Sequence, residues 1–144
     1  MIPISTPDLC DRYGEQLQIA EPVFRHYGGL RRFGGPIATV RCFEDNSKVG
    51  EMLRASGKGR ILVVDGGGSR RRSLLGDKLG QLAVDNGWQA LVIYGCLRDV
   101  EALAELPLAI LALGSTPRNT DKRGAGQVGV AVELARLRLR PGDY

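Results

Sequence analysis

Three short apolar runs divide the centre of the chain and constrain its fold more than any other feature. Each is continuous enough to be a strand buried on both faces: RILVVD, ALVIYG and LAILALG, at residues 60–65, 90–95 and 108–114. Helical spacing follows the first run, with Leu74, Leu75, Leu79, Leu82 and Ala83 on one face, and RDVEALAEL predicts a short helix after the second. Strands that alternate with helices predict right-handed crossovers and a partly parallel sheet.

The flanking segments complete a mixed α/β pattern. Thr6, followed by Pro7 and Asp8, predicts a helix to about residue 18, since proline and an acid favour the first turn. Residues 37–43 predict a strand and 46–55 a short helix. The tail GVAVELARLRLRPGDY alternates apolar and polar side chains and predicts half-exposed antiparallel strands. We expect one α/β domain, residues 1–144, with a mixed, partly parallel sheet, flanking helices and a second small β layer.

The composition excludes several classes of protein. Of 144 residues, 43% are hydrophobic and 25% charged, as in an ordinary soluble globule. Cys10, Cys42 and Cys96 form no CxxC pair, which favours reduced thiols over a disulfide framework or a zinc site. The chain shows no signal peptide and no run near the roughly 20 apolar residues of a membrane span. We expect a cytoplasmic protein without membrane contact.

The net charge of +4 is mild, but the basic residues are clustered. A dedicated nucleic-acid-binding domain carries a stronger excess. Solvated faces or subunit contacts are therefore the favoured interpretation of these clusters, and we expect no direct contact with nucleic acid. They lie at residues 31–32, 70–72, 122–123 and 136–140.

Three glycines, Gly66 to Gly68, follow the strand RILVVD in the manner of a phosphate-binding loop. The loop lacks the Gly-Lys-Ser/Thr of a Walker motif, and Arg71 stands where a dinucleotide-binding loop would have its last glycine. A formal G-x-G-x-x-G at residues 124–129 lies before a strand-like segment instead of a helix, so it is weak. Two interpretations of the triple glycine stay open: contact with a ligand, or tight backbone approach after a buried strand.

Asp77, Arg98 and Asp99 form the most informative constellation. Asp77 lies near the start of a predicted helix after the first central strand, and Arg98 and Asp99 follow the second strand. The carboxyl ends of parallel strands are where open α/β folds place ligands. A guanidinium can bind a substrate carboxylate bidentately, and a carboxylate such as Asp99 can bind a hard divalent cation. A surface ion pair would show the same spacing.

The chain resembles the RraA-like family over nearly its whole length. The resemblance is carried by FGGPIATVRCFEDN, by RILVVDGGGSRRRSLLGDKLGQLAVDNGWQALVIYGCLRDV and by ALGSTPRNTDKRGAGQ. This family unites the regulator of ribonuclease E activity A with class II 4-hydroxy-4-methyl-2-oxoglutarate aldolases. Its aldolase signature, an Asp followed after twenty residues by Arg-Asp, corresponds here to Asp77, Arg98 and Asp99.

The resemblance implies a fold and a site. The fold would be like the phosphohistidine "swivelling" β/β/α domain, in a homotrimer with sites between subunits. Gly76, Asp77, Lys78 and Leu79 would contact the substrate through backbone groups and an ordered water. Arg98 would bind the pyruvoyl part of a small 2-keto acid.

The implied chemistry requires a divalent metal cation, Mg²⁺ or Mn²⁺, anchored by Asp99. Cleavage of a carbon–carbon bond beside a 2-keto acid leaves a pyruvate enolate, whose charge the cation and Arg98 would stabilise. Asp77 would orient a water that exchanges a proton with the substrate hydroxyl. Oxaloacetate gives the same enolate on loss of CO₂, so oxaloacetate decarboxylase activity is expected as well.

Two departures from the family pattern accompany this expectation. Aldolase-like members tend to carry a carboxylate three residues after the aspartate of the Arg-Asp pair, where this chain has Ala102, while Glu101 is one position early. Family members also usually continue past the PGD segment into a last strand, whereas this sequence ends at Tyr144. Loss of that strand would expose a sheet edge or weaken assembly.

Two functions from different classes stay open. The first is the metal-dependent aldolase and decarboxylase. The second is a non-catalytic regulator that binds and inhibits ribonuclease E, as one branch of the family does; Asp99 favours catalytic competence without excluding regulation. Some family members also carry the name demethylmenaquinone methyltransferase, an activity that the glycine loop does not favour. The physiological substrate does not follow from the sequence.

Overall fold

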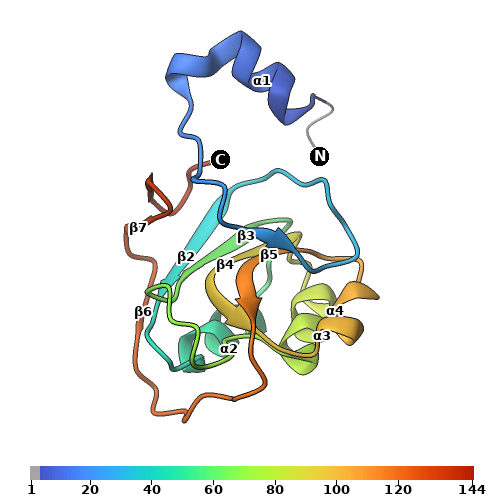
Figure 1. Cartoon of the computed structure of the whole chain (residues 1–144), viewed down its shortest axis with the longest axis vertical. Helices are drawn as coiled ribbons and strands as arrows, with labels where there is room; N and C mark the ends of the chain where they lie inside the picture. The colour runs from blue at the N-terminus through green and yellow to red at the C-terminus, as the bar shows by residue number, and fades with distance from the viewer. Residues whose placement is uncertain (1–3) are drawn as a thin grey trace.

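A computed structural model describes residues 4–144 of the chain, and its centre is a six-stranded mixed sheet (Figure 1). The strand order is β1-β5-β4-β3-β2-β6, and β2, β3, β4 and β5 run parallel to one another. The two edge strands, β1 and β6, pair antiparallel. The strands span Arg25–His26 (β1), Ile37–Arg41 (β2), Ile61–Asp65 (β3), Ala90–Leu97 (β4), Ala109–Ser115 (β5) and Gln127–Val128 (β6).

Each face of the sheet is covered by a different kind of element. One face packs against the helices Ser47–Arg54 (α2), Asp77–Asp85 (α3) and Val100–Ala104 (α4). The other packs against a hairpin of Val132–Leu134 (β7) and Leu137–Leu139 (β8). Strand β3 shows why both layers form: Leu62 and Val64 face the helices, while Ile61 and Val63 face the hairpin, and all four are buried. The expected mixed fold with a second small β layer is therefore confirmed.

Two segments differ from the lengths that the sequence predicts. The first helix, α1, spans Thr6–Tyr13 and is followed by a 3-10 turn, Gly14–Gln16. It buries no residue and projects from the end of the sheet, away from the other helices (Figure 1). The tail is three short strands because Gly129, Ala135 and Arg136 adopt positive φ and turn the chain. Among residues 4–144, no helix has the length and apolar character needed to cross a membrane.

Candidate active site

The segment Ser73–Leu75 brings the two halves of the site together. Ser73 forms parallel bridges to Cys96 at the end of β4 and to Asn119 beyond β5. The backbone N–H of Leu74 donates to the Cys96 carbonyl at 2.9 Å, and the N–H of Arg98 donates to the Leu75 carbonyl at 2.9 Å. The prediction that Leu74 and Leu75 belong to the following helix is wrong, because these tertiary hydrogen bonds hold the segment in a non-helical conformation. Helix α3 instead begins at Asp77, directly beside Arg98 and Asp99.

Asp77, Arg98 and Asp99 lie together, as their places after neighbouring strands predict. The Asp99 carboxylate accepts a 2.9 Å hydrogen bond from the backbone N–H of Asp77. The Nε atom of Arg98 lies 4.0 Å from the same carboxylate oxygen, and its Nη1 donates to the Pro117 carbonyl at 3.4 Å. Arg98 and Asp99 are 39% and 36% exposed, so both remain accessible to a small ligand.

Two backbone positions make this contact possible. Gly76 lies under the Arg98 and Asp99 side chains, and a Cβ atom there would approach the Asp99 carboxylate oxygen to 2.8 Å. Asp99 adopts a left-handed conformation with φ of 56°, which aspartate and asparagine tolerate better than most residues. This conformation is sparsely populated for residues other than glycine, and such strain is typical of functional sites.

The first turn of α3 presents backbone donors beside Arg98. Gly76 is the N-cap and supplies no side-chain hydrogen bond. Within residues 4–144, no hydrogen bond uses the backbone N–H of Lys78 or Leu79. Free N–H groups and the helix dipole make this end of a helix favourable for an anion.

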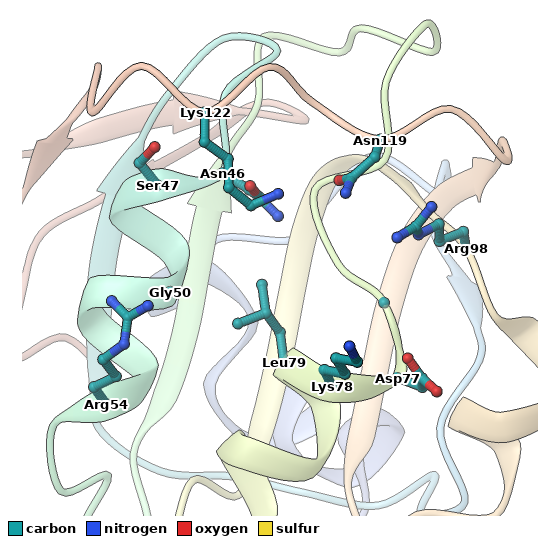
Figure 2. Close-up of a pocket in the computed structure, with 11 residues that line it drawn as sticks. Asn46, Ser47, Gly50, Arg54, Asp77, Lys78, Leu79, Arg98, Asn119 and Lys122 are labelled. Carbon is teal, nitrogen blue, oxygen red and sulfur yellow. The ribbon is translucent and has the colours of Figure 1, made fainter.

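Gly76, Asp77, Lys78, Leu79 and Arg98 line one wall of an open cleft of about 370 Å³. Asp99 lies at the edge of this wall and, with Arg98, lines the adjoining hollow. Figure 2 shows Arg98 and Asp77 on one side, the side chains of Lys78 and Leu79 in the middle, and helix α2 on the opposite side. No role follows from the sequence for the residues of the opposite wall, although the segments FEDN and TPRNTDKR contain two of them, Asn46 and Lys122. They are Asn46, Ser47, Gly50, Arg54 and Lys122, whereas Asn119 lies on the side of Arg98 (Figure 2). Neither Glu101 nor Ala102 is among the described residues that line the cleft.

Asp45 holds the rim of that opposite wall. Its carboxylate accepts hydrogen bonds from the backbone N–H and hydroxyl of Ser47, at 2.9 and 2.6 Å, and from the backbone N–H groups of Arg123 and Ala125, at 2.8 and 3.1 Å. Burial favours the neutral acid, but these hydrogen bonds outweigh it and lower the pKa of Asp45 to about 2. The loop that carries Lys122 is thereby tied to the start of α2.

Asn46 continues this connection into the cleft. Its buried side chain donates to the Leu74 carbonyl at 3.2 Å and accepts from the Thr120 hydroxyl at 2.8 Å. The amide therefore joins α2, the Ser73–Leu75 segment and the loop after β5.

The triple glycine and the three arginines have roles within the chain. A Cβ atom on Gly67 would approach the Phe43 ring to 2.8 Å, and one on Gly68 would approach the Tyr94 ring to 3.2 Å. These contacts support the interpretation of tight backbone approach. Arg70 and Arg72 donate to the carbonyls of Leu113 and Asn119, at 3.2 and 2.9 Å, and Arg71 pairs with Glu44 at 2.6 Å.

The oxygen donors beside Arg98 suit a hard cation with few protein ligands. One oxygen of the Asp99 carboxylate accepts from Asp77, which leaves the other oxygen available. Within residues 4–144, no group of three or more His, Cys, Asp or Glu side chains could hold a metal ion. A cation here would take most of its ligands from water or substrate, as Mg²⁺ commonly does.

Comparison with known proteins identifies relatives over nearly the whole chain. Residues 6–144 match the family described as RraA-like, Aldolase/RraA. A protein from Pseudomonas fluorescens is 55% identical over 139 residues, which cover 96% of this chain and 85% of the relative. A protein from Pseudomonas aeruginosa is 53% identical over the same length, 96% of this chain and 86% of the relative. Both carry the name "Putative 4-hydroxy-4-methyl-2-oxoglutarate aldolase".

Solved structures with the same fold carry two other names. A Geobacillus kaustophilus protein, named S-adenosylmethionine:2-dimethylmenaquinone methyltransferase, is 45% identical with a TM-score of 0.94, over 96% of this chain and 86% of that chain. The RNA-processing inhibitor RraA from Thermus thermophilus is 41% identical with a TM-score of 0.93, over 98% of this chain and 85% of that chain. The same fold and similar sequences thus occur under an enzymatic and a regulatory name.

We predict that Asp45→Asn lowers the free energy of unfolding by about 1–3 kcal/mol near neutral pH, because the amide cannot replace the carboxylate as acceptor of all four hydrogen bonds. A carboxylate whose pKa is lowered by folding stabilises the protein above its ordinary pKa of 3.8. That stabilisation is lost as the pH falls through the folded-state value of about 2. Denaturant unfolding should therefore show the difference between wild type and variant shrinking from about pH 4 towards pH 2. Exposed Asp85→Asn is the control, and a pH-independent difference for Asp45→Asn would contradict the prediction.

Proposed function

Since the chain belongs to the RraA-like family, we propose that it is a lyase, a divalent-metal-dependent class II aldolase that cleaves 4-hydroxy-4-methyl-2-oxoglutarate to pyruvate. The observation that carries this proposal is the meeting of Arg98 and Asp99 with the first turn of α3, where the small cleft and the adjoining hollow share Arg98. This arrangement offers a guanidinium, free backbone donors and a carboxylate to one small ligand. Those are the groups that a 2-keto acid and a hard cation require.

Substrate binding would begin at the 2-keto carboxylate. The Arg98 guanidinium and the free backbone N–H groups of Lys78 and Leu79 are donors from residues that line the same cleft. Together these donors would bind the substrate carboxylate and orient the keto oxygen towards Asp99. Such preorganised donors stabilise negative charge as it develops in the transition state.

Cleavage breaks the bond between C3 and C4 of the substrate. The C4 hydroxyl loses its proton, the C4–O bond becomes a carbonyl, and the electron pair of the broken bond passes into the C2–C3 enolate. Held by Asp99, a divalent cation would supply positive charge at the enolate oxygen. Protonation of C3 then completes the second pyruvate, so both products are pyruvate.

Asp77 is the residue that we propose for the proton transfers. It is the first residue of α3, lines the cleft and directly precedes Lys78 and Leu79, whose backbone N–H groups are the free donors. A water held by its carboxylate would accept the hydroxyl proton and return it to C3. Oxaloacetate would give the same enolate by losing CO₂ instead of a keto acid, so decarboxylation is the proposed second activity.

Regulation of ribonuclease E is the second candidate function. It is favoured by the likeness to the RNA-processing inhibitor RraA, at 41% identity and a TM-score of 0.93. An inhibitor that acts by docking uses its surface and does not need the cleft. The two functions therefore differ in their dependence on Asp99.

We predict that the purified protein releases pyruvate from 4-hydroxy-4-methyl-2-oxoglutarate and from oxaloacetate when Mg²⁺ is present, and that Asp99→Asn lowers kcat/KM by about 10²-fold or more. Asparagine retains the left-handed backbone and removes only the charge. Pyruvate is followed with lactate dehydrogenase and NADH, with Asp85→Asn and Asp99→Ala as comparison variants. The proposed chemistry would be refuted if wild-type turnover were no greater than that of the Asp99 variants. It would also be refuted if wild-type turnover persisted in the presence of EDTA.

For the regulatory candidate, the expected result is a slower cleavage of RNA by ribonuclease E and co-purification of the two proteins. Asp99→Asn should inhibit as well as wild type, because docking leaves the cleft unused. Absence of both inhibition and co-purification would remove this candidate.

We propose a homotrimer with sites between subunits as the working assembly. Residues 4–144 offer no cluster of metal ligands beside Arg98, and the cleft is open to solvent, so a neighbouring chain could complete the site. Light scattering after gel filtration should give three times the chain mass of 15.6 kDa. A monomer at micromolar concentration would contradict this assembly.

A further inference from the structure

The wall of the cleft opposite Arg98 carries a second arginine, Arg54, in the last turn of α2. Its guanidinium lies against Gly50, one helical turn earlier. A Cβ atom on Gly50 would lie 3.7 and 3.8 Å from the two Nη atoms of Arg54 and 3.7 Å from the Leu79 side chain. These are ordinary van der Waals distances, so the guanidinium and the Leu79 side chain both lie beside the Gly50 backbone at the cleft surface. Figure 2 shows Arg54 and Arg98 on opposite sides of the cleft, with Leu79 between them.

The charges of the cleft are strongly unbalanced. Its lining includes the cations Arg54, Lys78, Arg98 and Lys122 but a single carboxylate, Asp77. Within residues 4–144, no ion pair or side-chain hydrogen bond uses Arg54, Lys78 or Lys122. By contrast, Arg70, Arg71 and Arg72 are used to hold their own loop. Uncompensated cations in a concave surface attract a ligand with more than one negative charge.

We propose that Arg54 is a specificity-determining residue that binds the remote carboxylate of a dicarboxylic 2-keto acid whose keto-acid end lies at Arg98. This proposal rests on the proposed function, because it takes the Arg98 end as the place of the 2-keto carboxylate. The planar guanidinium can donate two parallel hydrogen bonds to a carboxylate, which a lysine cannot. Arg54 would therefore select keto acids with two carboxylates over those with one. It lies away from the bond that breaks and has no role in the proton transfers.

Two ligands that differ only in the remote carboxylate test this role: 2-oxoglutarate and 2-oxopentanoate. Titration calorimetry with Mg²⁺ present should show that wild type binds 2-oxoglutarate about 10- to 100-fold more tightly, as a charged hydrogen-bonded pair provides. Arg54→Met should abolish this preference and leave the affinity for 2-oxopentanoate unchanged within about twofold. Arg54→Lys should recover part of it. Lys48→Met is the matched control, since Lys48 lies on the same helix but pairs with Glu51 at 2.9 Å.

The outcomes separate this inference from the proposed function. The role of Arg54 would be overturned if wild type bound 2-oxoglutarate and 2-oxopentanoate equally tightly or bound neither. It would also be overturned if Arg54→Met kept the preference for 2-oxoglutarate. A preference that depends on Arg54 in a protein without pyruvate-forming turnover would support the dicarboxylate site and refute the aldolase chemistry. A cation in the last turn of a helix also stabilises it, so substitution of Arg54 could unfold α2. Thermal unfolding of each variant checks that changes in affinity do not arise in this way.

Discussion

Backbone hydrogen bonds between the Ser73–Leu75 segment and the end of β4 are the interaction on which the site depends. A loop of eleven residues separates Asp65 at the end of β3 from Asp77 at the start of α3, and without these bonds its last part would have no fixed place. The bonds to Cys96 and Arg98 set the segment beside β4. Arg98 and Asp99 directly follow β4, the strand to which the Ser73–Leu75 segment is bonded. They therefore lie beside the start of α3, which follows that segment.

The opposite wall is organised by a separate set of polar contacts. Asp45 ties the loop 121–126 to the start of α2, and Asn46 ties α2 to the Leu74 carbonyl. Both side chains are buried, so their hydrogen bonds are shielded from water and are costly to leave unmade. The cleft thus lies between two walls that are joined by the bond from Asn46 to the Leu74 carbonyl and by direct packing of α2 against α3.

The sequence was sufficient for the parallel strands of the sheet and for one wall of the site. Continuous apolar runs define β3, β4 and β5, and the rule that ligands lie at the carboxyl ends of parallel strands places Arg98 and Asp99 near Asp77. Strand β1 was missed because Arg25–His26 has no apolar run and is held only by pairing with β5. Leu74 and Leu75 have helical spacing, but tertiary hydrogen bonds outweigh that local preference. The residues of the other wall, such as Arg54 and Lys122, come from a helix face and an irregular loop, whose position no local pattern specifies.

The left-handed backbone of Asp99 restricts how this site can change during evolution. Aspartate, asparagine and glycine are the residues that adopt this conformation most readily, and a single nucleotide change converts an aspartate codon into an asparagine or a glycine codon. A gene copy can therefore lose the carboxylate in one mutational step while keeping the backbone of the turn. The same scaffold can then persist under selection for its surface alone, so descent from a catalytic to a binding role requires no intermediate with a disrupted fold.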